Sequence, residues 1–304
     1  MTRARIAVAD GGLWLESLPD HDELIRRWLP RPHPDPSSPL VTVRLGRLPD
    51  GERHRLLAHT DKPALTLGPV RAWVDPGTRA VSLAGRFGAG LVNLAAGAAE
   101  LDPGDSPEEG YAMLTLAAGL LLASVGRVLL HAGAVSRPDG GVLLVAGDTH
   151  SGKSTTTLTL ARLSGWAWLS DDQVVLASRD DGGVEVFGWA RRPHLDTGYL
   201  SGESTGQRGD AEMRFLAGLT WSGRGPHTGT LLPRIEPNGR SVGRGASAGA
   251  VMEALVRQGA WIMAEPETAR STLGVLQRAA ALPARALDLG PDSYARPDRL
   301  ATLL

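Results

Sequence analysis

A glycine-rich segment in the middle of the chain constrains its fold more than any other feature. Residues 147–154 read Gly-Asp-Thr-His-Ser-Gly-Lys-Ser and fit the pattern G-x-x-x-x-G-K-[ST]. An apolar run, 142–146, precedes this segment, and a helix-compatible stretch follows it. Strand, loop and helix in this order are typical of a P-loop, whose backbone N–H groups and helix dipole surround a phosphate. The sequence therefore predicts a site for a nucleoside triphosphate.

The positions of this segment have expected roles. The pattern predicts nucleotide binding by Gly147, Asp148, Thr149, His150, Ser151, Gly152, Lys153 and Ser154. Lys153 adds a full positive charge to the phosphate site, and the Ser154 hydroxyl can hold Mg²⁺. His150 could touch phosphate or simply face the solvent.

An acidic pair follows the next predicted strand. Asp171 and Asp172 come directly after the apolar run 166–170. Carboxylates at a strand end beside a P-loop are placed to hold Mg²⁺ and to orient or deprotonate a nucleophile. A surface turn is the alternative interpretation. Given the P-loop, we favour the functional one.

One histidine and three arginines are further candidates. His131 lies within a predicted strand, 128–135, whose hairpin partner leads into the P-loop. Its ring could therefore act as a general base near the phosphates, or be an ordinary core histidine. The arginines that could supply charge to a transferred phosphoryl group are Arg191, Arg192 and Arg234. Each of them could equally be a surface residue, because arginine is plentiful in this chain.

Composition excludes several classes of function. Hydrophobic residues make up 42% and charged residues 21% of the chain, which is typical of a globular protein. The net charge of −1 gives no general attraction to nucleic acid or to acidic membranes. The absence of cysteine removes disulfides, thiolate metal sites and cysteine nucleophiles, and fits a cytoplasmic protein. The longest apolar stretch, 112–125, is shorter than a membrane span, so we expect a buried helix.

Turn signals divide the chain into two predicted domains, 1–105 and 106–304, at the sequence Asp-Pro-Gly-Asp-Ser-Pro. The first domain reads as a β-rich region that could recognise a substrate. Its predicted strands are 5–9, 40–45, 64–67, 70–74 and 80–83, with a helix at 20–29 and a proline-rich loop at 31–39. Ser106 or Asp105 should cap a helix over 108–124 at the start of the second domain.

We expect the second domain to be an α/β fold with a mixed sheet and β-hairpins. One predicted hairpin leads into the P-loop, and the other pairs 173–177 with 184–189. Helices are expected from the P-loop to about residue 163, at 248–258, at 267–281 and at the end of the chain. A strand at 283–289 and a polar loop at 201–210 complete the prediction.

The order of these motifs resembles a known family. A histidine in a strand, a hairpin, a G-D-x-x-x-G-K-S loop and a strand ending in Asp-Asp are similar to the catalytic domain of HPr kinase/phosphorylase. That family has a P-loop fold related to phosphoenolpyruvate carboxykinase, and it transfers phosphate from ATP to a serine of a small carrier protein. The resemblance covers residues 115–304 and implies the following roles: Lys153 binds phosphate, Ser154 and Asp171 hold Mg²⁺, Asp172 takes the serine proton, and His131 is catalytic.

Several departures from the family pattern indicate which members of the family the chain resembles more. Thr149 and His150 replace a Ser-Gly pair, and Thr155 replaces a Glu. The Leu-Glu-x-Arg-Gly signature is absent, and residues 188–193 stand in its place. The family's N-terminal domain is not recognisable in 1–105. The chain is therefore more similar to shorter HPr-kinase-like proteins, some of which resemble kinases that phosphorylate a serine of ribosomally made peptides, including lasso-peptide precursors.

The sequence thus predicts a kinase that uses ATP and Mg²⁺ to phosphorylate a Ser or Thr of a peptide or small protein. It predicts no nucleic-acid or membrane partner. Members of the resembled family are often oligomeric, so a homo-oligomer is a further possibility. Two alternatives remain. One is a small-molecule kinase on the same scaffold, and the other is a non-catalytic interaction module that binds a nucleotide.

Overall fold

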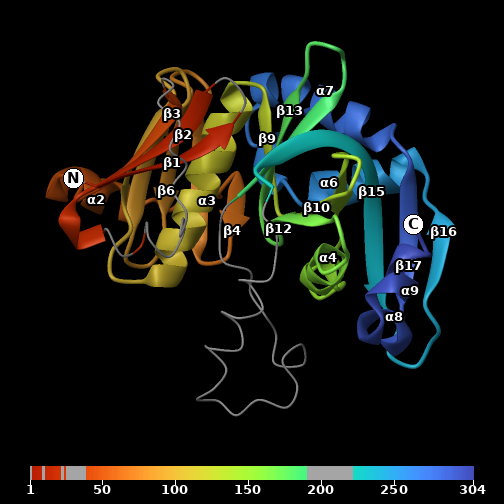
Figure 1. The fold of residues 1–304 in the computed structure, drawn as a ribbon. Helices are drawn as coiled ribbons and strands as arrows, with labels where there is room; N and C mark the ends of the chain where they lie inside the picture. The colour runs from red at the N-terminus through yellow and green to blue at the C-terminus, as the bar shows by residue number, and fades with distance from the viewer. Residues whose placement is uncertain (1, 9–10, 22–23, 25–38, 190–221) are drawn as a thin grey trace. The chain divides into compact units, whose positions relative to one another are not determined.

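The computed structural model describes residues 2–8, 11–21, 24, 39–189 and 222–304 (Figure 1). The chain forms two compact units, each with its own mixed β-sheet and helices. Unit 1 contains Met1–Leu129 and Gly259–Val275, and unit 2 contains Leu130–Gln258 and Leu276–Leu304. The predicted boundary between residues 105 and 106 falls inside unit 1, just before a long helix.

Several sequence predictions lie outside the described residues. Arg191, Arg192 and the predicted loop 201–210 all belong to this group, as does most of the predicted loop 31–39. Of the predicted helix 20–29, the structure describes only a 3₁₀ turn, η1 (Pro19–His21), and Leu24.

Unit 1 is built on an eight-stranded sheet in the order β1-β2-β3-β8-β7-β6-β5-β4. Its strands are β1 (Thr2–Val8), β2 (Gly11–Ser17), β3 (Pro39–Leu45), β4 (Leu65–Leu67), β5 (Val70–Asp75), β6 (Ala80–Ala84), β7 (Ala89–Asn93) and β8 (Ala98–Asp102). β3 pairs in parallel with β2 and β8, and the other pairs are antiparallel. β3 shows why the sequence forms strands, since Val41, Val43 and Leu45 are buried while Arg44 between them is exposed.

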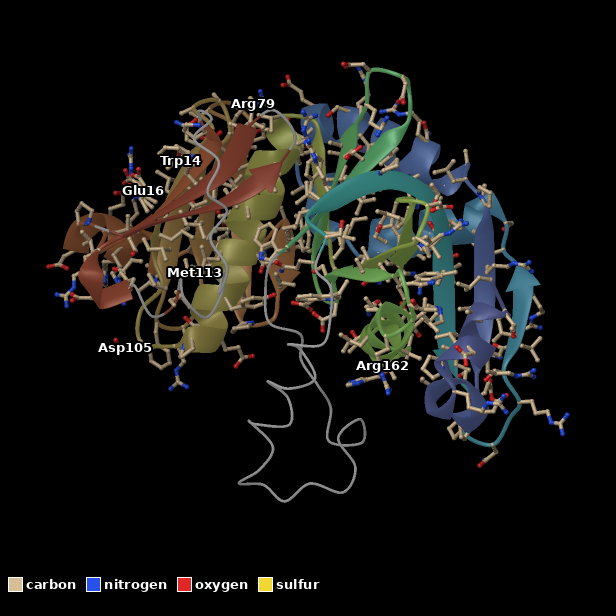
Figure 2. The ribbon with its side chains drawn as sticks, viewed as in Figure 1. Trp14, Glu16, Arg79, Asp105, Met113 and Arg162 are labelled. Atoms are coloured by element: carbon tan, nitrogen blue, oxygen red, sulfur yellow. The ribbon has the colours of Figure 1, made fainter. Side chains whose placement is uncertain are left out.

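A long apolar helix, α3 (Pro107–Ser124), packs against strands of this sheet. Ser106 caps it as predicted, because its hydroxyl accepts a hydrogen bond from the Glu109 backbone N–H at 3.3 Å. Met113 on this helix is fully buried (Figure 2). Residues 112–123 are buried throughout, which confirms the predicted buried helix. Among the described residues, no helix is long and apolar enough to cross a membrane.

Glu109 on α3 is a buried carboxylate with three backbone partners. Its two oxygens accept hydrogen bonds from the N–H groups of Arg86, Phe87 and Gly88, each at 2.9 Å. These contacts compensate the loss of hydration. They also fix the turn between β6 and β7 against the first turn of the helix.

Residues 259–275 return to unit 1 after the chain has passed through unit 2. They form η3 (Ala260–Met263) and the first part of α7 (Pro266–Ala280). Trp261 packs against α3, and its indole N–H donates to the Leu129 carbonyl at 3.1 Å. Arg79, labelled in Figure 2, forms ion pairs with Glu265 and Glu267. A shorter helix, α2 (Asp50–Leu57), packs against β6 and β7.

The sheet of unit 2 follows the order β12-β10-β11-β15-β14-β13, with β17 beside β15 and β16 beside β17. Its strands are β10 (Gly133–Ser136), β11 (Val142–Val145), β12 (Ala167–Ser170), β13 (Val174–Ser178), β14 (Val184–Gly188), β15 (Arg224–Ile235), β16 (Val242–Gly245) and β17 (Ala284–Leu289). Its helices include α4 (Lys153–Ala161), α6 (Ala248–Arg257), α8 (Pro291–Ala295) and α9 (Pro297–Ala301). The strand β9 (Arg127–Leu130) belongs to unit 1 except for its last residue.

The long, bent strand β15 organises this sheet (Figure 1). Its first residues pair with β14, and the later ones pair in parallel with both β11 and β17. Because β11, β15 and β17 run in the same direction, their C-terminal ends meet at one edge. The loop 146–152 leaves β11 at that edge. The sequence predictions include no element at 224–235. Glycine and proline are rare within strands, yet tertiary pairing holds Gly225, Pro226 and Pro233 in β15.

The prediction of one continuous strand over 128–135 is wrong. The run 128–135 is two strands, because β9 ends at Leu130 and β10 begins at Gly133. His131 and Ala132 lie between them. The backbone N–H of His131 donates to the Gln258 carbonyl at 2.9 Å instead of continuing a strand ladder. The predicted hairpins, the helix after the P-loop, and the helices and strand near the C-terminus are confirmed within a few residues.

The contact between α3 and Trp261 gives a stability prediction. A Cβ on Gly119 would lie 2.5 Å from the indole nitrogen of Trp261, and a rigid ring cannot yield cheaply. Overpacking of this kind costs about 1–3 kcal/mol, and the higher helix propensity of alanine offsets about 1 kcal/mol of that. Gly119→Ala should therefore lower the free energy of unfolding, measured by chemical denaturation.

Gly51→Ala is the matched control. Gly51 lies in the exposed part of α2, and its added Cβ would meet nothing within 4 Å. This substitution should leave stability unchanged or raise it by up to about 1 kcal/mol. Equal effects of the two substitutions would contradict the packing described for Trp261.

Candidate active site

The segment 147–154 turns sharply between β11 and α4. Gly147 and Gly152 have φ values of 153° and 98°, which L side chains rarely adopt. His150 has a φ of 63°, in a left-handed conformation that glycine favours but histidine tolerates better than most residues. The turn brings the N-terminus of α4, with its free N–H groups and positive dipole end, to face the loop.

Lys153, the first residue of α4, points its side chain back into the loop. It is 7% exposed, and its ammonium donates hydrogen bonds to the carbonyls of Gly147 at 2.9 Å and Asp148 at 3.0 Å. The pKa of Lys153 is below its ordinary value, because burial lowers it more than the negative charges of Asp172 and Asp148 raise it. A largely desolvated positive charge therefore lies at the centre of the loop.

Other features of the loop fit a bound phosphate. The Ser151 hydroxyl is buried and has no hydrogen-bond partner among the residues that the structure describes. A Cβ on Gly147 would lie 2.8 Å from this hydroxyl and 3.5 Å from the Pro233 carbonyl, so the loop needs glycine there. A buried ammonium, a donor without a described partner and a helix N-terminus are features typical of an anion site.

The predicted acid–base residues lie together on the β12 side of the loop. Asp172 follows β12, and its Oδ1 lies 3.1 Å from Nε2 of His131. The side chain of Asp172 is 25% exposed and that of His131 is 43% exposed, so both can be reached from solvent. Asp172 is also close enough for its charge to act on Lys153. The structure thus places three of the predicted residues in one site.

The two predicted Mg²⁺ ligands are neighbours. The Ser154 hydroxyl donates to the backbone carbonyl of Asp171 at 3.4 Å, and Asp171 is 2% exposed. No group of three or more His, Asp or Glu side chains placed to hold a metal ion occurs within the described part of the chain. A P-loop needs fewer protein ligands, because nucleotide oxygens and water complete the Mg²⁺ shell.

A cleft of about 590 Å³ opens on the other side of the loop. It is lined by residues 147–151, the C-terminal end of β15, and parts of β16, β17 and α6. Arg234, one of the predicted arginines, lies on this cleft and pairs with Glu236 and Asp288. Sequence reasoning missed two further lining arginines, Arg244 and Arg257. The spacing of Glu253 and Arg257 would have indicated only a surface helix.

A second histidine near the P-loop strand has a structural role. His227 on β15 is 5% exposed, and burial lowers its pKa to about 4, so it is neutral at pH 7. Its Nε2 lies 2.8 Å from the Gly229 carbonyl. His227 pairs with Val142 at the start of β11, away from the loop. Among these two histidines, only His131 has a carboxylate partner in the site.

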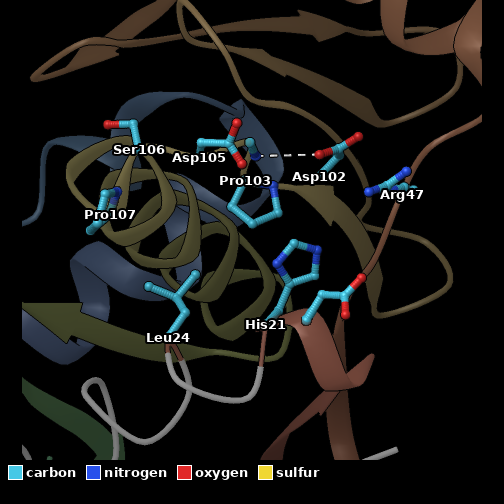
Figure 3. Close-up of a pocket in the computed structure, with 10 residues that line it drawn as sticks. His21, Leu24, Arg47, Asp102, Pro103, Asp105, Ser106 and Pro107 are labelled. Carbon is cyan, nitrogen blue, oxygen red and sulfur yellow. Dashed lines mark hydrogen bonds between the residues drawn. The ribbon is translucent and has the colours of Figure 1, made fainter.

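Unit 1 has a cavity of its own, of about 380 Å³ (Figure 3). His21, Arg47 and Asp102 are among the residues that line it. The Asp102 carboxylate accepts a hydrogen bond from Gly104 N–H and pairs with Arg53 at 3.3 Å. These contacts account for Asp102 as a structural residue that fixes the turn before α3.

The chain has likenesses among solved structures but no match among family models or curated proteins. Among solved structures, the chain is similar to the Hpr(Ser) kinase/phosphatase from Coxiella burnetii, with 14% identity and a TM-score of 0.29. The match covers 57% of this chain and 92% of that chain.

The buried ammonium of Lys153 predicts a specific dependence of stability on pH. The pKa of Lys153 is lower in the folded protein than its ordinary value of 10.5 in the unfolded chain. At pH values between these two pKa values, the folded protein therefore binds fewer protons than the unfolded chain. Native stability should therefore rise with pH through that interval, relative to Lys153→Met. Denaturation of both proteins at a series of pH values measures the difference, with the exposed Lys62→Met as the matched control. Parallel curves for native protein and Lys153→Met would contradict the desolvation of Lys153.

Proposed function

We propose that this protein is a kinase that uses ATP and Mg²⁺ to phosphorylate a Ser or Thr hydroxyl of a peptide or small protein. The observation that supports this proposal is the arrangement around Lys153. Its buried ammonium lies inside a loop with P-loop spacing, and Asp172, which pairs with His131, is close enough for its charge to act on that ammonium. The group proposed to bind phosphate and the group proposed to take the proton would therefore lie in the same site.

Each residue has a role in this proposal. The loop 147–154 binds the phosphates of ATP, and Lys153 exchanges its two carbonyl partners for phosphate oxygens. Ser154 and Asp171 would hold Mg²⁺, which would supply charge neutralisation of the phosphates. Since an ammonium and N–H groups already point at the phosphate position, little reorganisation would be needed in the reaction.

The reaction would be a direct transfer. Asp172 takes the proton of the acceptor hydroxyl while that oxygen forms a bond to the γ-phosphorus. The bond between the γ-phosphorus and the bridging β–γ oxygen breaks, and ADP leaves with the electron pair. His131 holds the Asp172 carboxylate in position through the 3.1 Å contact. Positioning and charge neutralisation would account for most of the rate increase.

The acceptor class is proposed from the motif order, which resembles that of kinases acting on serines of small proteins and peptides. A small-molecule acceptor, or nucleotide binding without catalysis, is the alternative outcome of the test. We propose a cytoplasmic location, which agrees with the supply of ATP and with the absence of cysteine.

The test is incubation with γ-labelled ATP and Mg²⁺, together with the small peptides encoded beside this gene, followed by mass spectrometry. The expected result is the gain of one phosphate on a Ser or Thr. Tight ATP binding with no transfer to any peptide would contradict the proposed acceptor class and favour one of the alternatives.

Asp172→Asn tests the proposed base. The amide has nearly the same shape but cannot take the proton, so transfer should fall about 100- to 10,000-fold. Affinity for ATP, measured by calorimetry, should stay within about threefold, because no direct phosphate contact is lost. Asp180→Asn, on an exposed hairpin turn, should keep the native rate. A native transfer rate in Asp172→Asn would show that another group takes the proton.

A further inference from the structure

Arg257, the last residue of α6, has contacts that the proposed roles above do not use. It lines the same cleft as residues 147–151 of the loop. Its Nη1 lies 3.6 Å from Oδ2 of Asp148, and its Nη2 donates to Oε1 of Glu253 at 2.6 Å. The side chain is 58% exposed, so the guanidinium borders solvent and can change partners.

The backbone that carries Arg257 is firmly held. Ser247 caps α6 by accepting a hydrogen bond from the Ala250 N–H at 3.2 Å. Val251 and Leu255 on the same helix are fully buried. Directly after Arg257, the Gln258 carbonyl accepts the hydrogen bond from His131 N–H. The end of α6 is thereby fixed, and an exposed guanidinium on a fixed backbone is suited to ligand binding.

Asp148 lies between two positive groups of the loop region. Its carboxylate pairs with Arg257, and its charge raises the pKa of Lys153. Its backbone carbonyl accepts a hydrogen bond from the Lys153 ammonium. The Asp148 side chain is 72% exposed, so its carboxylate lies beside the loop at the solvent edge. A carboxylate there is unfavourable for an incoming phosphate, unless its counter-ion can turn toward the phosphate instead.

We propose that Arg257 is a ligand of the nucleotide phosphates, held by Asp148 until the nucleotide binds. The proposal rests on the nucleotide binding proposed above. When a nucleoside triphosphate enters the loop, the guanidinium leaves the 3.6 Å contact with Asp148 and donates to phosphate oxygens. Arginine suits this exchange because its planar group offers two parallel N–H donors to a phosphate. The competing explanation is that Arg257 only screens the charge of Asp148.

A double-mutant cycle separates these two explanations. Binding of Mg·ATP is measured by titration calorimetry for the native protein, Arg257→Ala, Asp148→Asn and the double variant. If Arg257 is a phosphate ligand, Arg257→Ala weakens binding about tenfold, the lower range for a hydrogen bond to a charged group. The loss is at least as large in the Asp148→Asn background, where the guanidinium has no competing carboxylate. If Arg257→Ala has no effect in that background, Arg257 only screens Asp148 and the proposal is overturned.

Two further variants make the result specific. Arg257→Lys keeps the charge without the planar pair of donors and should recover part of the affinity. Arg285→Ala removes the same charge from an exposed residue of β17 that does not line the cleft, and should bind Mg·ATP like the native protein. A native protein that binds no Mg·ATP would overturn the proposed function as well. Native binding, with an Arg257 effect that disappears in Asp148→Asn, would overturn the Arg257 proposal alone.

Discussion

The site depends on the hydrogen bonds that the buried ammonium of Lys153 makes inside its loop. The ammonium is held by two carbonyls of its own loop, and these contacts close the loop over the N-terminus of α4. An ammonium in this position is costly to bury, which the lowered pKa of Lys153 reflects. Such a charge is favoured only when an anion or polar atoms surround it. The loop itself supplies two carbonyls, and in the proposed function a nucleotide supplies phosphate.

The sheet of unit 2 determines what surrounds this charge. β11, β15 and β17 run in parallel, so the loop emerges beside the ends of two other strands and borders the cleft. On the opposite side, the break between β9 and β10 places His131 next to Asp172. The end of α6 reaches both sides, through Arg257 to the loop and through Gln258 to His131.

The elements that depend on neighbouring residues alone could be predicted from the sequence. The P-loop strand and helix, the hairpins and the Ser106 cap all follow from glycine positions, capping and alternation, and the structure contains them. β15 and the break at His131 could not be read in this way, because tertiary pairing and the bond to Gln258 decide them. Arg257 reaches the site across a hundred residues of sequence, which no spacing encodes. One overlooked signal is that Lys153 is one of only two lysines in a chain rich in arginine.

Hydrogen–deuterium exchange of the full chain, with and without Mg·ATP, tests the central claim most directly. The account places the triphosphate in the loop 147–154, where its oxygens would accept hydrogen bonds from backbone N–H groups. Peptides that cover this loop and the first turn of α4 should therefore exchange more slowly when Mg·ATP is present. Slower exchange confined to other segments, or no change at saturating Mg·ATP, would contradict the account.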